Sequence, residues 1–313
     1  MSFNVVGVGE VLWDLLLTGP QLGGAPANFA YHAHALGAQT HVITRVGKDD
    51  YGGEIIRRFR GMGLSDSAVQ VDEVAPTGTA KVELSGDGLA HFTVQENVAW
   101  DFIALAPEAL AAARLADVIC FGSLAQRSET SCKTIQKLVA ATRAHALRVF
   151  DVNLRQRFYS RRVIEESLQL ANVMKLNDDE LPILAGMLDL IGSIEEQIER
   201  LAHIFQLQLI ALTRGANGSL LYQKTEAGER WSDCGSHPIE VVDTVGAGDS
   251  FTAAMVLGLL RKMDLDQINS IANKVARYVC SKSGATPSLP SEFAKIFSAM
   301  PLRVADQTAA EKG

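Results

Sequence analysis

The segment Asp243–Phe251 reads DTVGAGDSF and leads into an apolar run with helical periodicity. Small residues at a turn before a helix let the backbone approach an anion, and the first N–H groups of a helix lack partners inside it. We therefore expect Gly246, Ala247 and Gly248 to cradle phosphate charge. Asp249 has two interpretations: a helix cap, or a general base that faces the transferred phosphate.

Two further segments carry clusters of polar groups. The run Gly23–Ala30 reads GGAPANFA, and glycines followed by a proline predict backbone pressed against a ligand and then a helix start. Asp14 and Asn28 add a carboxylate and an amide, which suit a ligand rich in hydrogen-bonding groups. A plain Gly-Pro loop with a solvated Asp14 is the alternative. Lys175–Glu180 reads KLNDDE, whose acids are favourable in the first turn of a helix.

An α/β fold must position these groups. Short apolar β-rich runs alternate with longer helical patterns, which is typical of a doubly wound, mostly parallel sheet with helices on both faces, here in one domain spanning residues 1–313. The predicted strands are Asn4–Gly9, His41–Val46, Asp117–Gly122, Arg148–Asn153, Val173–Leu176 and Leu209–Thr213. The predicted helices are Ala27–Leu36, Gly53–Met62, Ser131–His145, Arg162–Ala171 and Ile194–Phe205.

Residues 68–101 depart from this alternation. Val69–Val74, Thr79–Leu84 and Ala90–Gln95 read as consecutive strands, with a turn at Ser85–Gly88 between the last two. We interpret this stretch as a small antiparallel β lid over the carboxyl ends of the parallel strands, where it would exclude water from phosphoryl transfer. The alternative is an extension of the main sheet at its edge.

Composition excludes several classes of protein. The chain has 313 residues, of which 47% are hydrophobic and 21% charged, and its formal net charge of -7 offers no bulk attraction to nucleic acid or an anionic membrane. The four cysteines form no CxxC pair, so neither a zinc site nor a disulfide framework is predicted. The first residues lack the pattern of an export signal, so a cytoplasmic location is expected.

Taken together, the motifs resemble those of the ribokinase (PfkB carbohydrate kinase) family, in family order from Gly7 to about Ser288. The resemblance implies ATP-dependent transfer of the γ-phosphate to a primary hydroxyl of a sugar. Asp249 would be the base, and Arg155, in the run DVNLR, would lie near the transferred phosphate. The combination of GGAPAN and DVNLR is most similar to the fructokinase branch, while ribose, 2-keto-3-deoxygluconate and other sugars stay open.

The resemblance also implies further contacts. The implied sugar contacts are Asp14, Gly24, Asn28 and Asn153. The implied nucleotide contacts are Thr213, Gly215, Asn273 and the loop Ser283–Ala285. Asn177 and Glu180 would support Mg²⁺ through water, and Asp243 with the Val245 carbonyl would hold K⁺, which some members bind. A homodimer formed through the lid is implied as well.

Two competing interpretations remain. In a dinucleotide-binding protein the third glycine of G-x-G-x-x-G would fall at position 12, which is Leu12, and no Walker-type P-loop occurs. A catalytically silent, sugar-binding regulator on the same fold is the second competitor. Such a regulator would have no chemical reason to keep all the residues expected to take part in phosphoryl transfer, namely Asp249, Gly246, Gly248, Glu180 and Arg155.

Overall fold

A nine-stranded sheet forms the centre of the molecule, in a computed structural model that describes residues 2–16, 19–84, 90–236 and 239–298. Its strand order is β13-β12-β11-β10-β9-β8-β1-β4-β5, and all neighbours are parallel except the β11-β12 and β12-β13 pairs. The strands are β1 Asn4–Val8, β4 Gln39–Gly47, β5 Val69–Asp72, β8 Val118–Gly122, β9 Leu147–Asp151, β10 Val173–Asn177, β11 Leu209–Thr213, β12 Ser219–Thr225 and β13 Gly228–Cys234.

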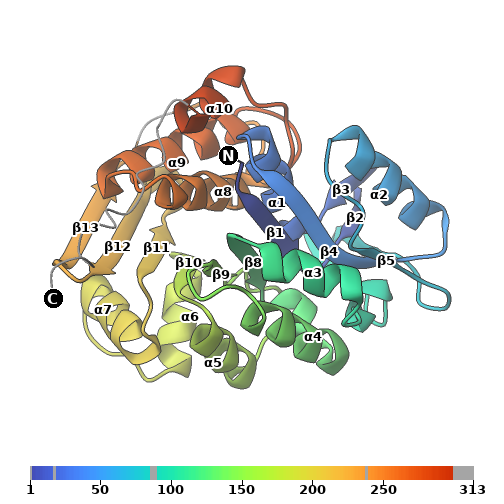
Figure 1. The fold of residues 1–313 in the computed structure, drawn as a ribbon, viewed down its shortest axis with the longest axis horizontal. Helices are drawn as coiled ribbons and strands as arrows, with labels where there is room; N and C mark the ends of the chain where they lie inside the picture. Colours follow the sequence, from blue (N-terminus) through green and yellow to red (C-terminus); the bar gives the residue numbers. More distant parts are fainter. Residues whose placement is uncertain (1, 17–18, 85–89, 237–238, 299–313) are drawn as a thin grey trace, which may run out of the picture.

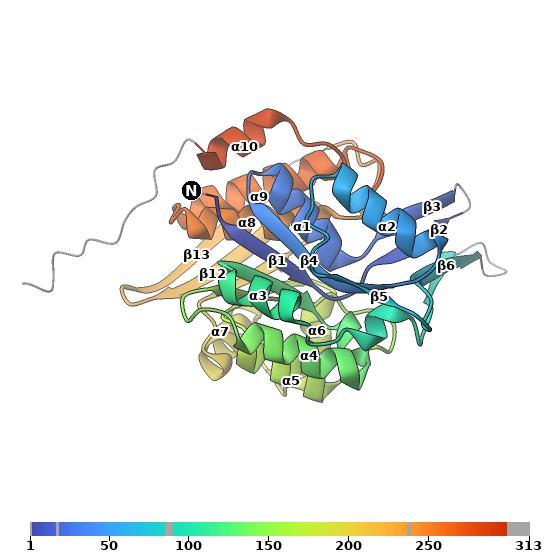
Figure 2. The same cartoon turned by 45° about the vertical axis from the view of Figure 1, so that its right-hand side comes forward.

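Helices cover both faces of this sheet (Figure 1). Figures 1 and 2 show α1, α8 and α9 on one face and α3 to α7 on the other. The helices are α1 Ala25–Ala35, α2 Asp50–Gly61, α3 Pro107–Leu115, α4 Glu129–Ala140, α5 Arg161–Leu170, α6 Glu180–Met187, α7 Ile194–Phe205, α8 Ala247–Leu260, α9 Leu265–Cys280 and α10 Ser291–Ser298. Short 3₁₀ turns, η1 to η3, lie at Ala99–Phe102, Leu124–Arg127 and Gly215–Asn217. The predicted doubly wound fold is confirmed.

The alternation of side chains along each strand divides the core between the two faces. In β10, Val173 packs into the cluster that contains residues of α8 and α9, whereas Met174 packs into the cluster on the opposite face. Because side chains in a strand point alternately to either face, Lys175 lies on the face that α8 covers. Asp151 of β9 lies opposite Lys175 in the parallel register and shares that face.

A second sheet, of four strands, lies beside the first. It consists of β3 Gly19–Gly23, β2 Leu12–Leu16, β6 Gly78–Leu84 and β7 Ala90–Val94, in that order, and Figure 2 shows β2, β3 and β6 extending beyond the large sheet. The outer pairs are antiparallel, while β2 and β6 are parallel. A small accessory sheet was predicted around the strands that form β6 and β7. Its other two strands, β2 and β3, come from the N-terminal segment.

The first strand predicted for the lid belongs elsewhere. Val69–Asp72 pairs in parallel with β4 and forms the edge of the large sheet. It was assigned to the lid because it precedes the other two strands without a helix, but strand order along the chain does not fix the pairing partner. The predicted turn at Ser85–Gly88 lies outside the described residues.

Candidate active site

Asp249 meets Asn28 of the GGAPAN loop across 221 residues of sequence. Asn28 Nδ2 donates to Asp249 Oδ2 at 2.9 Å, which joins the N-terminal turns of α1 and α8. The N-cap of α8 is Gly246, and Asp249 sits three residues later in the first turn. Its carboxylate is therefore directed at Asn28 of the GGAPAN loop instead of capping the helix. The contact favours the base among the two interpretations of this aspartate.

The cradle begins at Gly246, whose backbone is left-handed with φ of 79°. A Cβ added here would collide with the Ala285 carbonyl oxygen, so only glycine fits between α8 and the loop that follows α9. The Ala247 N–H already donates to Thr244 O over 3.3 Å, a long bond. The N-terminal turn of α8 still presents its remaining N–H groups and positive dipole end, which suits an anion.

Burial shapes the acidity of Asp249. Its pKa is raised to about 6. Removal from water is the largest cause and the carboxylate of Asp151 adds to it, while the Asn28 hydrogen bond and the charges of Lys175 and Arg155 act in the opposite direction. A carboxylate with this pKa stays ionised at neutral pH and still has a real affinity for a proton. Those are the properties that a general base needs.

The predicted sugar contacts gather around the same point. Asn153 and Asp249 line one small cavity, and Asn153 adopts a positive φ of 40° at the end of β9. Gly24 also has positive φ, at 115°, and a Cβ there would lie 2.6 Å from the Glu10 carbonyl oxygen. Asp14 lies in β2 of the small sheet, and burial raises its pKa to about 6 while Arg155 lowers it.

Arg155 is exposed, and its charge reaches three carboxyl groups. It lowers the pKa of Asp14, Asp249 and Glu10, although burial dominates the shift at each of them. The structure therefore places one guanidinium near both the predicted sugar contact and the predicted base. A guanidinium in this position suits a phosphoryl group, which it can bind with two parallel hydrogen bonds.

The KLNDDE run contains the end of β10, a short turn and the first residue of α6, Glu180. Asn177 Oδ1 accepts from the Glu180 N–H at 2.8 Å, and Glu180 is 4% exposed. The two Glu180 oxygens accept from the backbone N–H groups of Leu154 and Asn177, each at 2.8 Å. These bonds match the helix-start interpretation and tie α6 to the loop that carries Arg155. Each carboxylate oxygen has a second lone pair, so the same groups suit a water-mediated contact to Mg²⁺.

Comparison with known proteins agrees with this geometry. Residues 19–292 match the family model of the pfkB family carbohydrate kinases. The chain belongs to this family. A sugar kinase from Pyrococcus horikoshii is 29% identical over 310 residues, which are 90% of this chain and 91% of that protein. Fructokinase-1 of Zea mays is 29% identical over 315 residues, 92% of this chain and 95% of its own.

Solved structures of such kinases have the same fold. The crystal structure of the Pyrococcus horikoshii sugar kinase superposes with a TM-score of 0.79 at 29% identity and covers 93% of this chain and 96% of its own. The fructokinase of Xylella fastidiosa with bound ATP reaches a TM-score of 0.80 at 21% identity, over 94% of this chain and 98% of that one. The ribokinase-like fold predicted from the motifs is thereby confirmed.

The predicted K⁺ residues of this carbohydrate kinase occupy one turn. Asp243 Oδ1 accepts from the Val245 N–H at 3.0 Å, and Oδ2 accepts from the Gly284 N–H at 2.9 Å. Asp243 thus holds the segment before the cradle against the loop after α9. Among the described residues, no group of three or more His, Cys, Asp or Glu side chains has the geometry of a metal site. A cation here would need carbonyl ligands, such as that of Val245.

The predicted nucleotide contacts separate into two groups. Thr213 ends β11 and Gly215 begins η3 with φ of 53°, both at the carboxyl edge of the large sheet. Asn273 lies inside α9 and is 8% exposed. Its amide donates to Ser219 Oγ at 2.7 Å and to the Asn269 carbonyl at 2.9 Å, which packs α9 against β12. These contacts give Asn273 a place in the packing, and its contact with the nucleotide stays a prediction.

Sequence reasoning missed three charged residues beneath the site. Glu10 is 2% exposed, and burial raises its pKa to about 7. Asp151 and Lys175 are also buried, and their side chains form an ion pair of 3.1 Å. Both stand within runs quoted above as motifs. A charge in the interior of an apolar strand is the signal that could have singled them out, because such groups are almost never buried without a partner.

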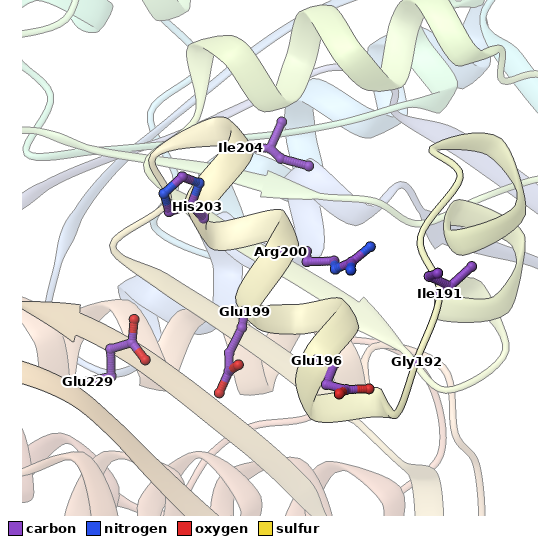
Figure 3. Close-up of a pocket in the computed structure, with 8 residues that line it drawn as sticks. All are labelled: Ile191, Gly192, Glu196, Glu199, Arg200, His203, Ile204 and Glu229. Carbon is purple, nitrogen blue, oxygen red and sulfur yellow. The ribbon is translucent and has the colours of Figure 1, made fainter.

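Another hollow, with a volume of about 520 Å³, lies elsewhere. Figure 3 shows its lining on α7, on the loop before α7 and on β13: Ile191, Gly192, Glu196, Glu199, Arg200, His203, Ile204 and Glu229. None of the predicted site residues contributes to it. Within the described part of the chain, no helix has the length and apolar character needed to cross a bilayer.

Proposed function

We propose that this protein is an ATP-dependent sugar kinase that transfers the γ-phosphate to a primary hydroxyl of a monosaccharide, with fructose as the first candidate. The observation that carries the proposal is the 2.9 Å contact from Asn28 Nδ2 to Asp249 Oδ2. It brings the loop suited to a polyol and the helix end suited to a phosphate to the same carboxylate. The family assignment supports the general reaction class.

In this mechanism Asp249 accepts the proton of the sugar hydroxyl. The freed oxygen forms a bond to the γ-phosphorus, and the bond from that phosphorus to the β–γ bridging oxygen breaks in line to release ADP. The backbone N–H groups of Gly246 and Gly248, on either side of Ala247, face the developing charge, and Arg155 helps to neutralise it. Positioning and charge stabilisation, without a covalent intermediate, provide the acceleration.

ATP and ions follow from the same reasoning. The Pyrococcus horikoshii kinase, which is 28% identical to this chain, has been crystallised with ATP, and this supports ATP as the donor here. Thr213 and Gly215 are the proposed nucleotide contacts. Asn177 and Glu180 would hold Mg²⁺ through water, where the ion neutralises phosphate charge. Asp243 and Val245 would hold K⁺ if this chain requires it, and a structurally similar fructokinase of Vibrio cholerae was solved with potassium, fructose and ADP.

The identity of the sugar rests on names of relatives. Fructokinases of Zea mays and Oryza sativa are 29% and 28% identical to the chain. Purified protein with MgATP, screened against fructose, ribose, 2-keto-3-deoxygluconate and other sugars while ADP release is followed, would rank the substrates. We expect the highest kcat/KM with fructose. If kcat/KM were at least ten-fold higher with another sugar, roughly the effect of one pocket contact, that sugar would replace fructose in the proposal.

The base is tested by Asp249→Asn. We expect kcat to fall by about two to four orders of magnitude, since a general base contributes about that much, while calorimetry still detects binding of sugar and ATP. Asp266→Asn is the matched control, because Asp266 is exposed in the first turn of α9. Turnover near that of the unmodified protein in Asp249→Asn would remove this residue from its role. A cytoplasmic location and a homodimer through the small sheet remain predictions, and sedimentation would test the latter.

A further inference from the structure

A buried ion pair crosses the middle of the large sheet. Lys175 Nζ lies 3.1 Å from Asp151 Oδ1, and the two residues are 6% and 5% exposed. They are direct neighbours in the parallel register of β9 and β10. Two residues earlier in each strand, Val149 and Val173 occupy the same face and are buried in the apolar core. Taking two charges out of water is costly, and apolar side chains of similar volume often serve stability as well, so the pair calls for another explanation.

The pair lies directly against the first turn of α8. A Cβ added to Gly248 would be 2.9 Å from Lys175 Nζ, so the ammonium group touches the cradle from beneath. Thr252 Oγ1 lies 3.2 Å from Asp151 Oδ2 and 3.0 Å from the Gly248 carbonyl oxygen, so its single hydrogen is shared between these two acceptors. The lysine is thereby fixed by the carboxylate, and the carboxylate by the helix. This arrangement places a positive charge next to the cradle with little freedom to move.

Asp249 is surrounded by charged and titratable groups from several elements, and these differ in how firmly they are held. Arg155 approaches from an exposed loop, whereas Lys175 is buried. Lys175 Nζ lies 3.1 Å from Asp151 Oδ1, and this ion pair supplies the opposite charge that a buried ammonium group requires. The groups that face Asp249 are Glu10 after β1, Cys120 on β8, Asp151 on β9, Arg155 after β9 and Lys175 on β10.

We propose that Asp151 and Lys175 are positioning residues for phosphoryl transfer, in which Asp151 holds the Lys175 ammonium under the cradle so that its charge stabilises ionised Asp249 and the phosphoryl oxygens above Gly248. The inference rests on the proposed function, because it takes Asp249 as the base. Lys175 lowers the pKa of Asp249 and Asp151 raises it. Removing one charge or the other should therefore move the activity profile in opposite directions.

The test compares Lys175→Met, Asp151→Asn and the double variant with the unmodified protein. The readouts are kcat, KM for sugar and for ATP, the acidic limb of kcat/KM against pH, and Tm. For Lys175→Met we expect kcat to fall about ten-fold or more and the limb to move up by about one pH unit. For Asp151→Asn the limb should move down. Lys224→Met, at an exposed position of β12, is the control and should change neither.

The double variant separates catalysis from folding. Lys175→Met alone leaves Asp151 buried without its partner, so it loses stability, and the double variant should recover much of that Tm because no lone charge remains. We expect its kcat to stay low. Two results together would overturn the inference and make the pair purely structural. The double variant would regain kcat as well as Tm, and the acidic limb of kcat/KM against pH would stay in place in all three variants. Asp249→Asn is measured in parallel: if it is inactive, such a result counts against the pair alone, whereas active Asp249→Asn counts against the base itself.

Discussion

Three carboxyl groups around the site are held at a cost to the folded state. Burial raises the pKa of Glu10 to about 7 and those of Asp14 and Asp249 to about 6. Glu10 is the most instructive, because its Oε2 atom is buried and has no hydrogen-bond partner among the residues that the structure describes. Groups of this kind are retained where chemistry needs them and are rare in a core that only packs.

Glu10→Gln tests this at the level of stability. A carboxyl group whose pKa is raised from 4.5 to about 7 binds its proton more tightly in the folded chain, so its contribution is present below pH 4.5 and lost as pH rises to 7. Glutamine does not titrate. The free energy of unfolding of Glu10→Gln, relative to the unmodified protein, should therefore improve by roughly 2–3 kcal/mol between pH 4.5 and pH 7.5. Denaturant unfolding at both pH values measures it.

Because the effect of Glu10→Gln on the free energy of unfolding is compared between two pH values, any pH-independent effect of the new amide cancels. Glu226→Gln, in the exposed turn between β12 and β13, should show the same effect at both pH values. A pH-independent effect of Glu10→Gln would mean that Glu10 has the same proton affinity in the folded and unfolded chains.

At the scale of elements, α1 joins the predicted sugar loop to the loop after α9. Its first turn carries Asn28, which binds Asp249, and one turn later His32 Nε2 lies 2.9 Å from the Ala285 carbonyl oxygen. Burial lowers the pKa of His32 to about 4, so the ring is neutral and Nε2 donates its hydrogen. Tyr31 donates to the Pro287 carbonyl at 3.2 Å. The helix therefore restrains the backbone that packs against the cradle glycine, Gly246.

We predict that His32→Ala loosens this loop. Loss of one buried neutral hydrogen bond is worth about 0.5–1.5 kcal/mol. Because the loop Ser283–Ala285 is a predicted nucleotide contact, KM for ATP should rise about two- to ten-fold while KM for the sugar changes less. Steady-state kinetics at saturating concentrations of the other substrate give both values. His145→Ala removes an exposed histidine and serves as the control. Equal increases in both KM values would indicate general loosening of α1.

The sequence predicted the core strands well and the small sheet only in part. Buried parallel strands read as continuous apolar runs, so β1, β8, β9, β10 and β11 were found nearly at their observed bounds. Leu12–Leu16 and Gly19–Gly23 were not predicted as strands, although they pair as β2 and β3. Pairing partners depend on contacts distant in sequence, which a pattern along one segment does not contain.

The same limit applies to the site. Motif residues that lie at turns and helix starts, such as Asp249 and Asn28, were identified because glycine spacing marks such places. Lys175 and Asp151 were not, since their pairing follows from the register of β9 and β10. The packing role of Asn273 was likewise not predicted, because the contact of its amide with Ser219 joins α9 to a strand 54 residues earlier in the sequence.

At the scale of the whole molecule, the small sheet must stay fixed to the body if it is to cover the site. The chain returns from β7 through η1, where Asp101 meets Arg127 of η2 in a paired contact, Nε to Oδ1 and Nη2 to Oδ2, each at 2.8 Å. Both side chains are buried, and the guanidinium carbon lies 3.9 Å from the centre of the Trp100 ring. This ion pair anchors the end of the small sheet to the helical layer that contains α4.

Arg127→Met should therefore be costly for the whole fold. It leaves Asp101 buried without its partner, a change that typically destabilises by about 3–5 kcal/mol, and it removes the stacking on Trp100. The double variant Asp101→Asn/Arg127→Met should recover a large part of that loss, because no lone charge remains. Lys133→Met breaks the exposed pair with Glu129 and should cost less than about 1 kcal/mol. Urea unfolding gives all three values, and a loss in Arg127→Met no larger than that in Lys133→Met would show that the small sheet is anchored by its apolar contacts instead.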